Sequence, residues 1–196
     1  MRGHVRSVLI GVLFVAAVST ARAQVTFTPQ VGVNASFLRG DIDQVTRSAS
    51  AGYQIGVNVR FGDFLHLQQG LYWQRTESKL SYEEVQTSDF VSTDMIHVPI
   101  LAGLKILPLE TLGIRVNTGA SLNFVTSVGQ NTLGLTKDDF KPFLMGWVIG
   151  VGMDVLFLSA DLSYELGLTT AVEVDLPDEV VRLKNDVLRF NVGIRF

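Results

Sequence analysis

The last stretch of the chain, Leu188–Phe196 (LRFNVGIRF), follows a strict alternation. Every even position holds a large apolar residue, and every odd position holds Arg, Asn or Gly. A side-chain period of two is typical of a β-strand with one apolar face and one polar face. The rest of the chain indicates which of these two faces points inward.

The same alternation recurs, so that the chain contains eight such stretches. They are Gln30–Phe37, Tyr53–Phe61, Leu65–Gln74, Ile96–Ile106, Leu112–Phe124, Phe143–Val155, Ala160–Leu168 and Leu188–Phe196. Gln69 breaks the pattern of the third stretch, because it is a polar residue on the apolar side. We expect each stretch to form one strand.

The connections between the stretches alternate in length. Short ones lie near Gly62-Asp63, Leu107–Thr111 and Leu156–Leu158. Long polar links are expected at Arg39–Ser50, Ser78–Phe90, Ser127–Lys141 and Ala171–Lys184. Short turns at one end and longer loops at the other are typical of outer-membrane barrels, whose short turns are periplasmic.

Charged residues on the polar faces indicate which side is inside. In a soluble core these charges would be very costly unless each were paired, whereas in a membrane barrel they can pair with one another or be hydrated. We therefore predict that the apolar faces contact lipid. The predicted polar network of the lumen comprises Arg60, His97, Lys105, Arg115, Asp154, Asp161, Glu165, Arg189 and Arg195.

These patterns predict an all-β fold, an eight-stranded antiparallel up-and-down transmembrane β-barrel. Eight strands leave an interior that side chains can fill. Aromatic residues at the strand ends predict two girdles at the membrane interfaces. The short-turn girdle would contain Phe27, Phe61, Phe64, Phe157 and Phe196, and the long-loop girdle Phe37, Tyr53, Trp73, Phe124 and Phe143.

The first 23 residues have the features of a secretory signal peptide. Arg2 and Arg6 precede the apolar run Val8–Val18, and Ala21-Arg22-Ala23 resembles a cleavage site. We therefore expect residues 1–23 to be removed and residues 24–196 to form one outer-membrane barrel domain. The whole chain has a formal charge of −3, and its first 23 residues contain no acid. The barrel domain is thus more acidic still, which argues against nucleic acid as a partner.

The sequence contains no clear motif for catalysis or for a cofactor. His66 and His97 lack a second ligand at metal-binding spacing, and the acidic loop clusters lack the spacing of a calcium loop. Gly150 and Gly152 lie within a strand with no helix after it, so they do not form a phosphate loop. We predict no catalytic, cofactor-binding or metal-binding residues.

Several segments resemble the PorT-like outer membrane protein β-barrel family, which includes small eight-stranded barrels of the OmpA and OmpX type. They are Ile96–Leu101 (IHVPIL), Gly113–Gly119 (GIRVNTG), Asp161–Leu168 (DLSYELGL) and the terminal Phe196. The resemblance implies that Phe190, Val192, Ile194 and Phe196 form the signal read by the barrel-assembly machinery. His97 stands where similar proteins have an acidic residue.

The leading functional hypothesis is a non-enzymatic outer-membrane protein whose loops contact other envelope components. One alternative is a small porin-like channel, which would need a water path past Arg60, Arg115 and Arg189. Another is a secretion-associated barrel, as in some members of the family. A lipid-modifying enzyme would require a Ser and a His to meet at the rim. The expected partners are outer-membrane lipid, the assembly machinery and envelope proteins.

Overall fold

The computed structural model describes residues 24–39, 49–81, 88–109, 111–129, 142–175 and 180–196, and the expected signal peptide lies outside these ranges. The described residues form nine strands. They are β1 (Val25–Arg39), β2 (Ala49–Gly62), β3 (Leu65–Ser81), β4 (Ser88–Pro108), β5 (Leu112–Val128), β6 (Phe143–Val155), β7 (Leu158–Gly167), β8 (Thr170–Asp175) and β9 (Val180–Ile194).

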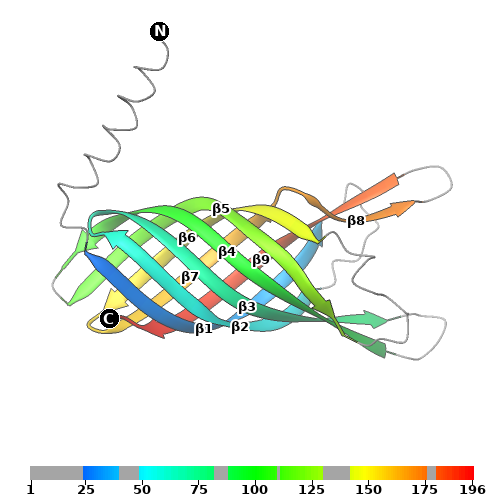
Figure 1. Ribbon diagram of the computed structural model, residues 1–196, viewed down its shortest axis with the longest axis horizontal. Coiled ribbons are helices and arrows are strands. Elements are labelled where there is room, and N and C mark those ends of the chain that lie inside the picture. The colour runs from blue at the N-terminus through cyan, green and yellow to red at the C-terminus, as the bar shows by residue number, and fades with distance from the viewer. Residues whose placement is uncertain (1–23, 40–48, 82–87, 110, 130–141, 176–179) are drawn as a thin grey trace, which may run out of the picture.

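All the pairings are antiparallel, and β1 pairs with β9 to close the sheet into a barrel (Figure 1). Both β7 and β8 pair with β9, one after the other along its length. β7 and β8 therefore count as one strand of the barrel, which is interrupted at Leu168 and Thr169. The predicted fold, a closed eight-stranded antiparallel barrel, is confirmed.

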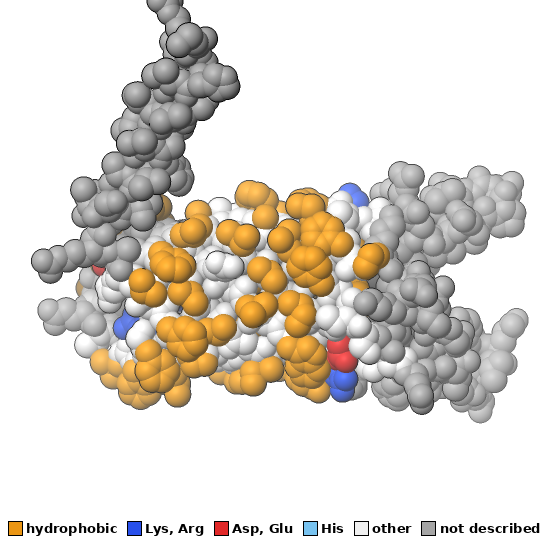
Figure 2. Space-filling view, in the orientation of Figure 1, with side chains coloured by type: hydrophobic (Ala, Val, Ile, Leu, Met, Phe, Trp, Pro, Cys, Tyr) orange, Lys and Arg blue, Asp and Glu red, His pale blue; other side chains and the backbone are white. Residues whose placement is uncertain are grey.

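The barrel is apolar outside and polar inside. In β6, residues alternate between exposed and buried along almost the whole strand. Exposed large hydrophobic residues outnumber buried ones, whereas the buried set consists mainly of polar and charged side chains. Figure 2 shows hydrophobic side chains spread over the wall, with charged ones near its two ends. The predicted facing of the strands agrees with this arrangement.

Two of the expected long links are wrong in extent. Within Ser78–Phe90, β3 continues to Ser81 and β4 begins at Ser88. Within Ala171–Lys184, β8 and the start of β9 form a paired ribbon. Strand residues beyond the bilayer need no lipid-facing side, so backbone pairing can continue there without the long apolar alternation of a membrane-spanning strand. Figure 1 shows both ribbons projecting at the end of the barrel opposite Phe196.

The aromatic residues mark the two edges of the apolar band. At the short-turn end, the exposed rings are those of Phe27, Phe61, Phe64, Phe157 and Phe196. At the other end, Tyr53 packs edge-on against Trp73 with 5.8 Å between ring centroids, and the Arg75 guanidinium lies 5.4 Å from the Trp73 ring. Arg75 also makes a two-pronged ion pair with Asp94, with N–O distances of 2.7 and 2.8 Å. No helix among the described residues is long and apolar enough to cross a membrane.

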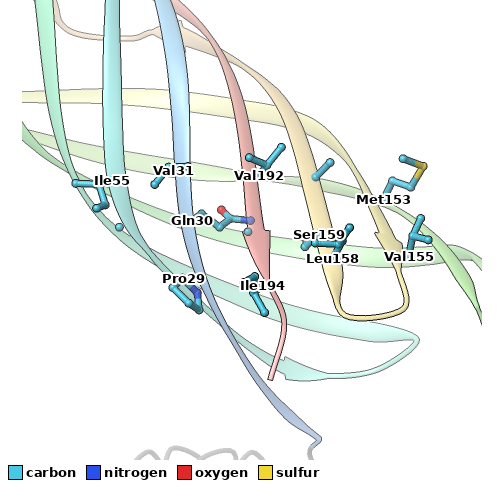
Figure 3. Close-up of a pocket in the computed structure, with 13 residues that line it drawn as sticks. Pro29, Gln30, Val31, Ile55, Met153, Val155, Leu158, Ser159, Val192 and Ile194 are labelled. Atoms are coloured by element: carbon cyan, nitrogen blue, oxygen red, sulfur yellow. The ribbon is translucent and has the colours of Figure 1, made fainter.

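The closing seam between β1 and β9 contains a local gap at Pro29. Phe27 and Phe196 exchange two backbone hydrogen bonds of 3.1 and 2.9 Å, and the regular ladder begins only at Gln30 and Gly193. Proline has no N–H to donate to a neighbouring strand. An open apolar groove of about 670 Å³ lies on the outer wall at this seam, between β2 and β6 (Figure 3). In a bilayer, acyl chains would fill this groove.

Candidate functional site

The lumen contains two clusters of buried charged residues. The turn-side cluster consists of Arg60, Arg115, Asp154 and Asp161, near the short turns. Arg60 Nη1 lies 2.9 Å from Asp154 Oδ2, and Arg115 Nη1 pairs with Asp154 Oδ1. Arg115 Nη2 lies 2.5 Å from Asp161 Oδ1. Both carboxylates are therefore held by the Arg115 guanidinium, while Asp154 is shared with Arg60.

The loop-side cluster consists of His97, Asn123, Glu165 and Arg189. Arg189 Nη1 lies 2.7 Å from Glu165 Oε2, and Asn123 Nδ2 donates to Glu165 Oε1 over 2.7 Å. His97 Nδ1 is 2.7 Å from Asn123 Oδ1 and 3.7 Å from Glu165 Oε2. This cluster thus contains one arginine and one carboxylate.

Glycines on facing strands make room for these long side chains. Gly152 pairs with Arg115, and a Cβ atom at Gly152 would lie 2.5 Å from the guanidinium carbon. A Cβ at Gly146 would lie 2.6 Å from Glu165 Cγ. The absence of a side chain at these glycines of β6 therefore leaves space in the lumen for Arg115 and Glu165.

Amide and hydroxyl groups extend the turn-side cluster towards the middle of the lumen. Gln30 Nε2 donates to Asp161 Oδ2 over 2.7 Å, while its Oε1 accepts from Tyr72 Oη over 2.5 Å and from Asn58 Nδ2 over 2.9 Å. Gln30, Tyr72 and Asn58 are not part of the network predicted from the sequence. Their strand positions could have identified them, because they lie on the same polar faces as the charged residues.

Two residues of the predicted network lie at the rim instead of the interior. Lys105 pairs with Asp63 of the β2–β3 turn. The Arg195 side chain is 30% exposed, donates to the Leu156 carbonyl over 2.6 Å and lies 3.3 Å from Asp154 Oδ2. Arg195 therefore joins the turn-side cluster from its edge.

The proposed assembly signal lies on the outer wall. Phe190, Val192, Ile194 and Phe196 are 47%, 43%, 46% and 74% exposed. These side chains are accessible from the lipid side, and their recognition by the assembly machinery stays a prediction.

The clusters balance charge within the barrel. Arg60, Arg115 and Arg189 are buried and contact the buried carboxylates of Asp154, Asp161 and Glu165. Burying an unpaired charge is far more costly than burying a pair with good hydrogen bonds. In the described part of the chain, no group of three or more His, Cys, Asp or Glu residues is placed to hold a metal ion. This arrangement is suited to filling the lumen with mutually neutralising side chains.

Two small cavities lie inside the lumen. A cavity of about 30 Å³ lies between the two clusters, beside Tyr72 and Val148, and another of about 20 Å³ lies near Glu165 and Arg189. A cavity of this size has room for only one or two water molecules. The described side chains therefore fill most of the barrel cross-section.

Comparison with known proteins identifies the family. Residues 19–173 match the family described as "Outer membrane protein beta-barrel domain". The chain belongs to this family. Its members' location and the closed barrel place the protein in the cell outer membrane. No sequence among the curated proteins matches the chain significantly.

Two solved structures with the same architecture are distant from this chain in sequence. The outer membrane protein OprG from Pseudomonas aeruginosa matches with 8% identity and a TM-score of 0.57, over 89% of this chain and 96% of OprG. Neisserial surface protein A matches with 14% identity and a TM-score of 0.54, over 87% of this chain and 97% of that protein. At these identities the likeness supports the fold alone.

Proposed function

We propose that this family member is a plugged, non-enzymatic barrel that acts in the envelope through the ribbons at its loop end. The observation that carries the proposal is the filled lumen, where the Arg60–Asp154 ion pair joins the opposite strands β2 and β6 and Arg189 reaches Gln74 of β3. The cavities beside these contacts have room for only one or two waters. We also base this proposal on the resemblance of Ile96–Leu101 and Gly113–Gly119 to PorT-like barrels. It is compatible with a role in contact with other envelope proteins.

The two projecting ribbons are the part of the barrel best placed for such contacts. From Trp73 in the girdle, β3 continues for about 26 Å along the strand to Ser81. The β8–β9 ribbon projects from the same end. Short turns face the periplasm in outer-membrane barrels, so this end faces the outside of the cell.

Conductance in planar bilayers tests the plugged lumen. The refolded chain should stay silent, after heat-modifiable gel mobility has shown that it is folded. The double variant Arg115→Ala and Arg189→Ala provides the comparison, because it shortens two side chains that fill the lumen. If it folds, it should conduct. Steady conductance by the unaltered chain would favour the small-channel alternative, which the polar lining of the lumen supports.

Protease accessibility on intact cells tests the orientation. A protease site inserted within 82–87, between β3 and β4, should be cut by protease added outside. The matched control carries the same site at Gly62-Asp63, in the β2–β3 turn, and should be cut only after the outer membrane is opened. The reverse pattern would reject an outward-facing role for the ribbons.

A further inference from the structure

Gln69 is a polar residue in the middle of the lipid-facing wall. It is exposed on β3, midway between Leu65 and Trp73 at the two edges of the apolar band. Either edge is about 13 Å away along the strand, which is beyond the reach of a glutamine side chain. The amide therefore cannot escape to the headgroups, as a longer side chain near an edge can.

The surroundings of Gln69 offer no hydrogen-bond partner. It pairs with Val59 of β2 and Ile100 of β4, and its neighbours on the same face of β3 are Leu67 and Leu71. Within the described residues, its amide has no hydrogen bond. An unsatisfied amide in hydrocarbon is costly, because lipid tails neither donate nor accept.

Two other polar side chains on the lipid-facing wall have hydrogen-bond partners within the barrel. The Thr118 hydroxyl donates to the Val148 carbonyl over 3.1 Å, and the Tyr164 hydroxyl donates to Asp186 Oδ2 over 3.0 Å. Gln69 differs from both, since its donor and its acceptor remain directed into the lipid. A partner in the membrane is needed to satisfy them.

We propose that Gln69 lies at the centre of an interface with a second copy of this chain. A primary amide is self-complementary, because its N–H₂ group donates and its oxygen accepts. At a two-fold axis each residue on the axis meets its own copy. Two Gln69 amides can then exchange two hydrogen bonds, as Asn and Gln side chains do between transmembrane helices.

The wall beside Gln69 suits close approach. Ala102 is exposed on β4, and Ala120 is half-buried on β5, where it pairs with Ile100. Small residues allow close approach between packed transmembrane helices, and the same steric argument applies to two barrel walls. With the axis at Gln69, β4 of one copy faces β2 of the other, so a short side chain on β4 lessens the bulk between the two walls.

Cross-linking locates the interface, because the chain has no cysteine of its own. Ile100→Cys places a thiol beside Gln69 while keeping the amide. The matched control, Leu162→Cys, places a thiol on β7 across the barrel, where Leu162 is 45% exposed to the lipid side. In lipid vesicles, a short bismaleimide should join two copies of Ile100→Cys and leave Leu162→Cys monomeric. Equal cross-linking of the two variants would reject the proposal.

Fluorescence energy transfer between labelled copies measures the role of the amide. Gln69→Leu should weaken self-association by at least about tenfold, while Gln69→Asn should retain part of it, because asparagine keeps the amide. Unchanged association in Gln69→Leu would overturn the proposal. Cross-linking of Ile100→Cys in native membranes to a different protein, with no product containing two copies, would overturn it too.

Discussion

The turn-side and loop-side clusters both compensate buried charge, but they differ in how many partners each charged residue has. In the turn-side cluster, Asp154 contacts Arg60 and Arg115 and lies near Arg195, and Arg115 also holds Asp161. In the loop-side cluster, Glu165 has a single arginine partner, Arg189. A shared cluster distributes charge among several partners, so its central carboxylate matters more than any one cation. In a single ion pair, the loss of either residue leaves the other without a charged partner.

The largest effect is expected for Asp154→Asn. It removes the carboxylate that faces three arginines, so that buried positive charge loses its compensation. The free energy of unfolding should fall by about 5 kcal/mol, the upper end of the range for a broken buried ion pair. Urea unfolding in lipid vesicles, followed by gel mobility, measures the change. Asp63→Asn at the exposed rim is the matched control and should change stability by less than about 1 kcal/mol. Similar losses in both variants would contradict a central role for Asp154.

The next largest effect is expected for Arg189→Met. This change leaves Glu165 buried without a cation and should cost about 3 kcal/mol. Adding Glu165→Met should restore most of the stability, because it removes the orphaned charge. The turn-side pair Arg60→Met and Asp154→Asn should show no such recovery, since Arg115 and Arg195 keep their charges. A double-mutant cycle for each pair gives the coupling energies, and equal recovery in the two clusters would remove the distinction between them.

A smaller effect is expected for Arg60→Met alone. Asp154 keeps its contacts with Arg115 and with Ser159, whose hydroxyl donates to it over 2.8 Å. The loss should be about 1.5–2 kcal/mol, as for one hydrogen bond to a charged group. The same unfolding experiment checks this value. A loss larger than that of Asp154→Asn would show that the cation, and not the carboxylate, is the centre of the cluster.

The smallest effect is expected for Arg195→Gln. The Arg195 side chain is 30% exposed at the rim, where water screens its attraction to Asp154. The expected change in unfolding free energy is below about 1 kcal/mol. Because solvent-exposed pairs weaken with salt, any difference from the unaltered chain should shrink at high ionic strength. A difference that is independent of salt would place Arg195 inside the cluster proper.

The strands within the bilayer were predictable from sequence because lipid imposes a strict rule on them. Nearly every second residue is apolar there, with Gln69 and Thr118 as exceptions, and Phe143–Val155 was predicted with the same bounds that β6 has in the structure. Beyond the bilayer this rule does not apply, so Ser78–Ser81 and β8, whose apolar alternation is limited to Val172 and Val174, were interpreted as parts of long loops. The environment of a segment thus determines whether its pattern is informative.

Most of the buried charged residues were predictable from the alternation, but their pairing was not. Lys105 and Arg195 of the predicted set lie at the rim, and the buried Asp186 was missed. The alternation predicts whether a side chain points into the lumen or to the lipid. The ion-pair partner of each residue depends instead on the register between strands. Lys105 lies opposite Arg115 on β5, yet its side chain reaches the β2–β3 turn and pairs with Asp63. A register shift between Lys105 and Leu107 accompanies this position. The local sequence predicts neither the register shift nor the pairing of Lys105 with Asp63.

The alternation of the wall also bears on how the chain reaches its membrane. A protein of the outer membrane must first pass the inner one, where a run of about 20 apolar residues would be retained as a helix. In the described strands, polar residues or glycines interrupt every apolar stretch long before that length. A continuous hydrophobic surface forms only when the strands pair and bring the alternate side chains onto one face. Its affinity for lipid is therefore a property of the folded barrel, which lets the unfolded chain cross one bilayer and the finished barrel reside in another.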